Sequence, residues 1–234
     1  MKKIILNISL LIFVSSCMES PTAVGISDVQ ILHTETKFKI VNAIQNKVYV
    51  KEYSPQGNIL KYLRFEENNV KQVSEFEYDG GTQIETITDE NENSIRTVEY
   101  KVNDNGKVDE VSTYDVLGNV LGSKLYEYDE YGRVIKLISS DTNSVDNILT
   151  YNYDTDKNGR VNLISIVNDK NETIKYDSLV YSNNQITKFT IDQKGEIEQV
   201  ISLLYDPSGK IESETILNGK NEITCKFIYR YTFY

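Results

Sequence analysis

The segment best suited to metal chemistry begins at Asp154. Oxygen-bearing side chains occupy its first, third and fifth positions, Asp154, Asp156 and Asn158, and Gly159 occupies the sixth. This spacing matches the first half of an EF-hand calcium loop. Ser165 stands where the bidentate glutamate should be, and the flanking residues are patterned as strands rather than helices. The segment therefore predicts a lengthened hairpin loop, with a Ca²⁺ site as the alternative.

Acid–base and nucleophilic catalysis have few candidate residues. His33 is the single histidine, and no Gly-x-Ser-x-Gly nucleophile motif occurs. Carboxylate pairs could be chosen in many ways from 35 acidic residues, so no pair stands out. Cys225 lies in a strand-like segment that is typical of a small packed residue. We expect a protein that is not an enzyme and needs no cofactor.

The cysteine with the most informative context is Cys17. A basic start at Lys2-Lys3 precedes a short apolar run, and two serines come directly before the cysteine. This order is typical of a secretory signal peptide. Because it ends on cysteine, the leader resembles a bacterial lipobox, which implies cleavage before Cys17 and acylation of its sulfur and new amino terminus. We predict a signal peptide over residues 1–16 and attachment to the lipid bilayer through Cys17.

Residues 17–28 are rich in serine, proline, threonine and glycine, which predicts a flexible tether. The residue after Cys17 is Met18 rather than aspartate, which favours the outer membrane and leaves the leaflet open. The chain has 35 acidic and 25 basic side chains, and loss of Lys2 and Lys3 with the leader would leave 23 basic and a net charge of −12. Nucleic acid, which attracts basic clusters, is therefore not an expected partner.

A recurring tyrosine organises the rest of the chain. Most copies are followed by a turn and then by valine or isoleucine, and the spacing is 22 to 28 residues. A period of this length indicates a repeat architecture. The copies at Tyr100 and Tyr153 are predicted to carry two extra loop residues. The series comprises Tyr53, Tyr78, Tyr100, Tyr128, Tyr153, Tyr181, Tyr205 and Tyr229.

Turn residues alternate with short runs rich in β-branched and aromatic side chains. The pattern predicts an all-β fold, a long antiparallel meander of about 16 short strands built from two-strand repeats of about 25 residues. It forms a single domain over residues 29–234, whose sheet is open, coiled or partly closed. A transmembrane barrel is disfavoured because charges occupy both faces of most strands. We place turns near residues 46, 57, 69, 81, 92, 106, 118, 132, 143, 159, 170, 184, 195, 209 and 219.

Three copies share a Tyr-Asp pair with a glycine three residues after the aspartate: Tyr114-Asp115…Gly118, Tyr128-Asp129…Gly132-Arg133-Val134 and Tyr205-Asp206…Gly209-Lys210-Ile211. This pattern resembles the YD repeat of the RHS family, over about residues 48–234. The resemblance implies the meander and a cell-surface or secreted setting, and proteins of this family are often credited with carbohydrate or protein binding. No functional residue transfers, because the repeat residues are scaffold.

The tyrosines themselves fit two roles. Aromatic side chains at hairpin ends pack across strands, whereas an exposed ladder would bind a ligand, because tyrosine has an apolar ring and a polar tip. The candidate ligand-binding residues are Tyr78, Tyr100, Tyr128, Tyr153, Tyr181 and Tyr205.

Three functional hypotheses follow from the leader and the repeats. The leading hypothesis is a non-enzymatic envelope lipoprotein that presents a repeat-built β sheet to a glycan or protein ligand. The alternatives are a periplasm-facing structural partner, which would bind by edge-strand pairing, and a carrier of an apolar ligand within a curled sheet.

Overall fold

Ten turns of the described chain share one set of hydrogen bonds. In the turn that starts at Asp129, the Asp129 amide donates to the Arg133 carbonyl and the Gly132 amide donates to the Asp129 carbonyl, each at 2.9 Å. The Asp129 carboxylate accepts from the amides of Tyr131 and Arg133. Gly132 has φ 76°, the left-handed conformation that glycine adopts readily. The bonds recur in turns that start at Ser54, Asp89, Asn103, Asp115, Asp129, Asp156, Asn168, Asp192, Asp206 and Asn218.

Such a turn, a type I turn followed by a left-handed residue, joins two antiparallel strands and adds a bulge beside the turn. The computed structural model describes residues 32–142 and 146–233, in which these and shorter turns connect sixteen strands. The strands are β1 (Leu32–Val41), β2 (Ile44–Tyr53), β3 (Ile59–Glu66), β4 (Asn69–Asp79), β5 (Thr82–Asp89), β6 (Ser94–Val102), β7 (Val108–Tyr114), β8 (Val120–Tyr128), β9 (Val134–Asp141), β10 (Asn147–Thr155), β11 (Val161–Val167), β12 (Thr173–Ser182), β13 (Gln185–Asp192), β14 (Ile197–Tyr205), β15 (Ile211–Asn218) and β16 (Ile223–Phe233).

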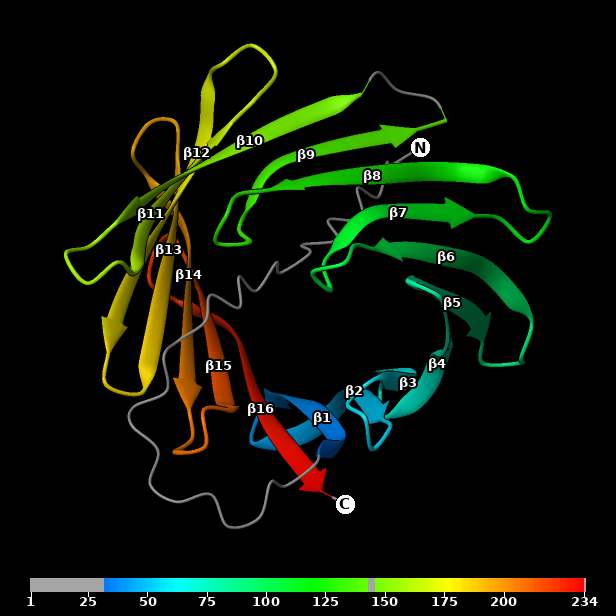
Figure 1. Cartoon of the computed structure of the whole chain (residues 1–234). Coiled ribbons are helices and arrows are strands. Elements are labelled where there is room, and N and C mark those ends of the chain that lie inside the picture. The colour runs from blue at the N-terminus through cyan, green and yellow to red at the C-terminus, as the bar shows by residue number, and fades with distance from the viewer. Residues whose placement is uncertain (1–31, 143–145, 234) are drawn as a thin grey trace, which may run out of the picture.

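The sheet closes into a barrel (Figure 1). Every strand pairs with its sequence neighbours, and β1 pairs antiparallel with β16, placing Glu35 opposite Tyr231 and Lys37 opposite Tyr229. The predicted all-β meander of sixteen antiparallel strands is confirmed, and the sheet is neither open nor merely coiled. Strand twist together with a bulge beside most hairpins curves the sheet until its first and last strands meet. Within the described residues, no helix is long and apolar enough to cross a membrane.

Two details of the predicted turns are wrong. The first turn lies at Asn42-Ala43, where both residues have positive φ, and not near residue 46, which belongs to β2. The two extra residues after Tyr100 and Tyr153 extend β6 and β10 and leave the following loops unchanged. Asn103 and Asp156 accordingly take the place that aspartate has in the Tyr-Asp copies, because either side chain can accept the two turn amides.

The strand register shows which side chains share a face of the sheet. Lys51, Tyr62, Ser74, Ile87 and Arg96 pair in succession across β2 to β6, so they lie on one face. Ser74 is fully buried and Ile87 is 2% exposed. The side chains of this face therefore crowd together, as expected on the concave side of a curved sheet.

A contact across three strands identifies the same face as the inside of the barrel. Lys37 of β1 pairs with Tyr49, two residues before Lys51, and its ammonium lies 2.7 Å from the Glu214 carboxylate of β15. The contact passes over β16, which separates the two strands. We call this face, which carries the tyrosine series, the inner face.

The inner face is not a packed core. A barrel of sixteen strands is wide enough to enclose an aqueous channel. Accordingly, Arg64 on the inner face is exposed, and Lys124 and Arg96 are only partly buried. Few apolar side chains of the barrel are buried; among the described residues they are Ile87, Val98, Val134, Val167, Ile201 and Leu203.

The outer face is charged over the first half of the barrel. Cross-strand neighbours with opposite charges pair there at 2.7 to 3.2 Å: Lys61 with Glu75, Lys101 with Glu110 and Lys136 with Glu127. Pairs of this kind suit a surface in contact with water.

Candidate functional site

A repeated clasp joins successive two-strand units at one rim of the barrel. The Tyr153 hydroxyl donates to the Val134 carbonyl at 2.6 Å, and the Arg133 guanidinium lies 4.7 Å from the centre of the Tyr153 ring. Arg133 also pairs with the carboxylate of Asp129 in its own turn, at 2.6 Å. The glycine, basic and aliphatic residues that follow the aspartate thus position the tyrosine of the next unit through a cation–π contact and a hydrogen bond.

The same clasp occurs at three further tyrosines. Tyr128, Tyr181 and Tyr231 donate to the carbonyls of Val108, Val161 and Ile211 at 2.6 to 2.8 Å, and Lys107, Arg160 and Lys210 lie 5.0 to 5.9 Å from the three rings. Tyr78 makes the hydrogen bond alone, to the carbonyl of Ile59.

The structure places all six predicted ligand-binding tyrosines on the inner face. Tyr78, Tyr128, Tyr153 and Tyr181 use their hydroxyls in these backbone bonds, and Tyr100 donates to the Glu85 carboxylate at 2.6 Å. Tyr205 has a raised pKa because of burial, and its hydroxyl bonds to no described residue. The cross-strand packing role of the series is therefore visible in the contacts.

Loss of one clasp hydrogen bond should be measurable. We expect Tyr153→Phe to lower the free energy of unfolding by about 1 kcal/mol, because the carbonyl of the buried residue Val134 loses its tyrosine donor. Tyr126→Phe is the matched control, since the Tyr126 hydroxyl bonds to no described residue. Urea unfolding of both variants checks the difference, and equal costs would contradict the clasp.

Carboxylates in the middle of the inner face are bonded within the barrel. Glu35 accepts from the Tyr49 hydroxyl at 2.5 Å, and Asp177 accepts from the Thr190 hydroxyl at 2.7 Å and lies 3.3 Å from the Lys188 ammonium. Glu214 accepts from Tyr229 at 2.6 Å in addition to Lys37. Their negative charges are therefore already compensated by neighbouring donors.

Three further inner-face tyrosines have hydroxyls that bond to none of residues 32–142 and 146–233. They are Tyr62, Tyr126 and Tyr151, and burial raises the pKa of each. Sequence reasoning did not select them as ligand-binding residues. The sequence does indicate Tyr126 and Tyr151, because alternation in Tyr126-Glu127-Tyr128 and Tyr151-Asn152-Tyr153 places both tyrosines of each segment on one face.

The predicted metal-binding residues lie in and beside a turn of the common kind. The Asp156 carboxylate accepts from the amides of Asn158 and Arg160 and pairs with the Arg160 guanidinium at 2.8 Å. Asp154 belongs to β10, on the outer face. The part of the chain that the structure describes contains no group of three histidine, cysteine, aspartate or glutamate side chains able to hold a metal ion.

Two other predictions concern cysteines and the leader. Cys17, the signal peptide and residues 17–28 lie outside the described residues. Cys225 is a free, partly buried cysteine on the inner face of β16, paired opposite Ile216.

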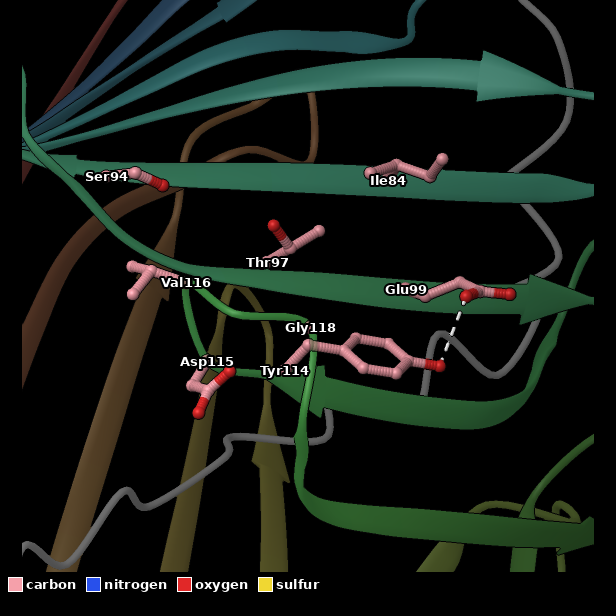
Figure 2. A pocket seen from close by; sticks show the side chains of 8 residues that line it. All are labelled: Ile84, Ser94, Thr97, Glu99, Tyr114, Asp115, Val116 and Gly118. Carbon is pink, nitrogen blue, oxygen red and sulfur yellow. Dashed lines mark hydrogen bonds between the residues drawn. The ribbon is translucent and has the colours of Figure 1, made fainter.

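A shallow cavity of about 360 Å³ lies on the outer face, where the loop after β7 turns back over β5 and β6 (Figure 2). The Tyr114 hydroxyl donates to the Glu99 carboxylate at 3.4 Å along its floor. The other lining residues are Ile84, Ser94, Thr97, Asp115, Val116 and Gly118. This cavity offers no cluster of groups suited to catalysis, whereas the inner face gathers tyrosines and cations over the length of the barrel.

No protein-family model and no curated protein matches this chain. Among solved structures it is similar to a porin-like protein from Bacteroides uniformis, at 12% identity and a TM-score of 0.42 over 88% of this chain and 98% of that one. A porin-like protein from Bacteroides vulgatus is similar at 11% identity and a TM-score of 0.49, over 87% and 99%. A chain of TcdB2-TccC3-Cdc42 is similar at 10% identity and a TM-score of 0.26, over 79% and 16%. By its own topology, the chain is a closed antiparallel barrel of sixteen strands.

Proposed function

We propose that this protein is a non-enzymatic envelope lipoprotein whose barrel interior recognises a glycan or protein chain. The lining of the inner face is the observation that carries the proposal. Tyr62, Tyr126 and Tyr151 have hydroxyls that form no hydrogen bond with a described residue, and the Tyr62 ring lies 5.4 Å from the Tyr49 ring. A tyrosine of this kind can stack against a ligand and hydrogen-bond to it. A concave surface with a few unsatisfied polar groups is typical of a binding site.

We also propose that the barrel stands outside the bilayer and is attached to the outer membrane by acyl chains on Cys17. The lipobox at the leader supports the anchor. The outer-face ion pairs, such as Lys101 with Glu110, support the position outside the bilayer, because each lysine facing lipid would cost about 2–4 kcal/mol at the bilayer centre. The common turn gives a physical meaning to the aspartate and glycine of all three Tyr-Asp copies, and Tyr128 of one copy also makes the clasp. Both features support a relationship to YD-repeat proteins.

Binding of polysaccharides to inner-face variants tests the proposed recognition. Isothermal titration of the folded barrel with a panel of neutral and acidic soluble polysaccharides should identify at least one ligand. We expect a Tyr126→Ser/Tyr151→Ser variant to bind that ligand at least tenfold more weakly. Tyr176→Ser, on the outer face of β12, is the control and should bind as the unchanged protein does. Equal binding by all three proteins would exclude the inner face as the site.

A carrier of apolar ligands is the second candidate, and an apolar patch on the inner face favours it. Leu137 pairs with Leu149, and Ile166 and Ile164 follow on the next strand opposite Tyr151 and Tyr153. Native mass spectrometry of protein purified from cells would reveal a bound lipid.

Edge-strand pairing with another envelope protein loses its physical basis, because closure leaves no free edge among the sixteen described strands.

A further inference from the structure

Arg96 and Ser74 present buried polar atoms on the inner face that have no internal partner. The Arg96 Nε and the Ser74 hydroxyl oxygen are both buried, and neither has a hydrogen-bond partner among residues 32–142 and 146–233. The two residues lie on β6 and β4, and Ile87 of β5 pairs with both. A buried polar atom without a partner is costly, so an acceptor from outside the described chain is expected here.

The Glu85 carboxylate of the inner face is not that acceptor. Glu85 lies two residues from Ile87 along β5, and its carboxylate accepts from the Tyr100 hydroxyl at 2.6 Å. No ion pair joins Arg96 to Glu85 or to another acidic side chain of the described residues. Arg96 therefore keeps its full charge on a half-buried surface, where an ion pair with a ligand is stronger than in water.

Two other cations on the inner face between β3 and β8 are also without an ion pair among the described residues. Arg64 of β3 pairs in register with Gln72, and Lys124 of β8 pairs with Val111, so both lie on the inner face with Arg96. The chain as a whole has a net charge of −10. Three cations without an ion pair among the described residues thus share the inner wall from β3 to β8 with the Glu85 carboxylate, in a protein that is otherwise acidic.

We infer that this wall is an anion-binding site, with Arg96 as its central contact, for the acidic groups of a glycan chain. The inference rests on the proposed recognition of a chain by the barrel interior and names its chemical class. Guanidinium groups bind carboxylate, phosphate and sulfate through paired hydrogen bonds, which gives Arg96 and Arg64 a direct role.

The spacing of the cations fits a chain better than a single small anion. Arg64 and Arg96 are three strands apart, and Arg96 and Lys124 are two strands apart. With neighbouring strands about 4.8 Å from each other, Arg96 lies roughly 10–15 Å across the sheet from each of the other two cations, and Arg64 and Lys124 are about 24 Å apart. A polymer with acidic groups along its length can reach all three cations. Tyr62 and Tyr126, whose hydroxyls form no hydrogen bond with a described residue, lie on the same wall.

Titration with polygalacturonate, and with neutral galactan for comparison, tests the inference. We expect the unchanged protein to bind polygalacturonate and to lose affinity as salt is raised. Arg96→Gln should bind at least tenfold more weakly, Arg64→Gln/Arg96→Gln/Lys124→Gln at least a hundredfold, and Arg96→Lys should recover part of the loss. Lys136→Gln removes one charge from the outer face and should leave binding unchanged. Urea unfolding of each variant establishes that it remains folded.

Each contrary result has a separate meaning. Equal binding of galactan and polygalacturonate, with no loss in Arg96→Gln, would overturn the anion site and leave glycan recognition standing. If Lys136→Gln weakens the binding of polygalacturonate as much as Arg96→Gln does, the effect is one of general charge, and the site would also be overturned. Binding of neither polymer to the unchanged protein would overturn the anion site, whereas glycan recognition is overturned when the whole polysaccharide panel yields no ligand.

Discussion

Replacement of Lys37 by alanine should lower the free energy of unfolding by about 3–5 kcal/mol, because it leaves a buried carboxylate without its cation. The Glu214 side chain is 4% exposed, and the Lys37 ammonium lies 2.7 Å from it. The contact joins β1 to β15 over β16 and so spans the seam at which the barrel closes. The ammonium also lies 4.0 Å from the centre of the Phe227 ring of β16.

Chemical unfolding of two further variants separates this effect from ordinary charge loss. Lys101→Ala breaks an ion pair in which the side chains are 55% and 30% exposed, and it should cost less than about 1 kcal/mol. Lys37→Met/Glu214→Leu removes both partners of the buried pair and should recover most of the stability. A Lys37→Ala cost no larger than that of Lys101→Ala would refute the role of the pair at the seam.

Alkaline pH should destabilise the barrel steeply. Tyr49, Tyr100 and Tyr229 each donate to an inner-face glutamate, and burial, followed by the adjacent carboxylate, raises the pKa of all three well above 10.0. Above pH 10 the unfolded chain releases these phenolic protons while the folded chain retains them, so stability present below pH 10 is lost as the pH rises. The loss is about 1.4 kcal/mol per pH unit for each tyrosine, and about 4 kcal/mol for the three.

Urea unfolding at pH 8, 9, 10 and 11 measures the slope, and ultraviolet absorbance of tyrosinate reports the ionisation. A variant with phenylalanine at Tyr49, Tyr100 and Tyr229 should show a shallower decline above pH 10, whatever its stability at neutral pH. An equally steep decline in that variant would assign the alkaline loss to other groups.

The turns were the most predictable part of the fold, because their chemistry is local. The left-handed positions at Gly132 and Gly209, each three residues after an aspartate, could be read from the sequence directly. The first turn was misplaced because Ala43 takes a positive φ that its side chain gives no reason to expect. Here the register of β1 with β2, a property of the sheet, determines the turn.

Closure of the barrel was not predictable, because it depends on long-range pairing. The bonds between Leu32–Lys39 and Phe227–Phe233 join the first and last strands of the sheet. Nothing in the local sequence pattern of either strand indicates that the other is its partner. The same limit applied to the site. Arg64, Arg96 and Lys124 are separated in sequence and share a face because of the registers of six paired strands. Tyr126 and Tyr151, in contrast, stand two residues from members of the tyrosine series.

Because the common turn and the clasp are repeated, the circumference of the barrel depends on the number of two-strand units. Ten turns have the same bonds, so an added or deleted two-strand unit that these turns bound would meet its neighbours as the present ones do. One unit contributes two strands, or roughly 10 Å of perimeter. Unequal recombination between such similar segments could therefore widen or narrow the interior in fixed steps, and chains of different lengths could enclose ligands of different girth with the same structural parts.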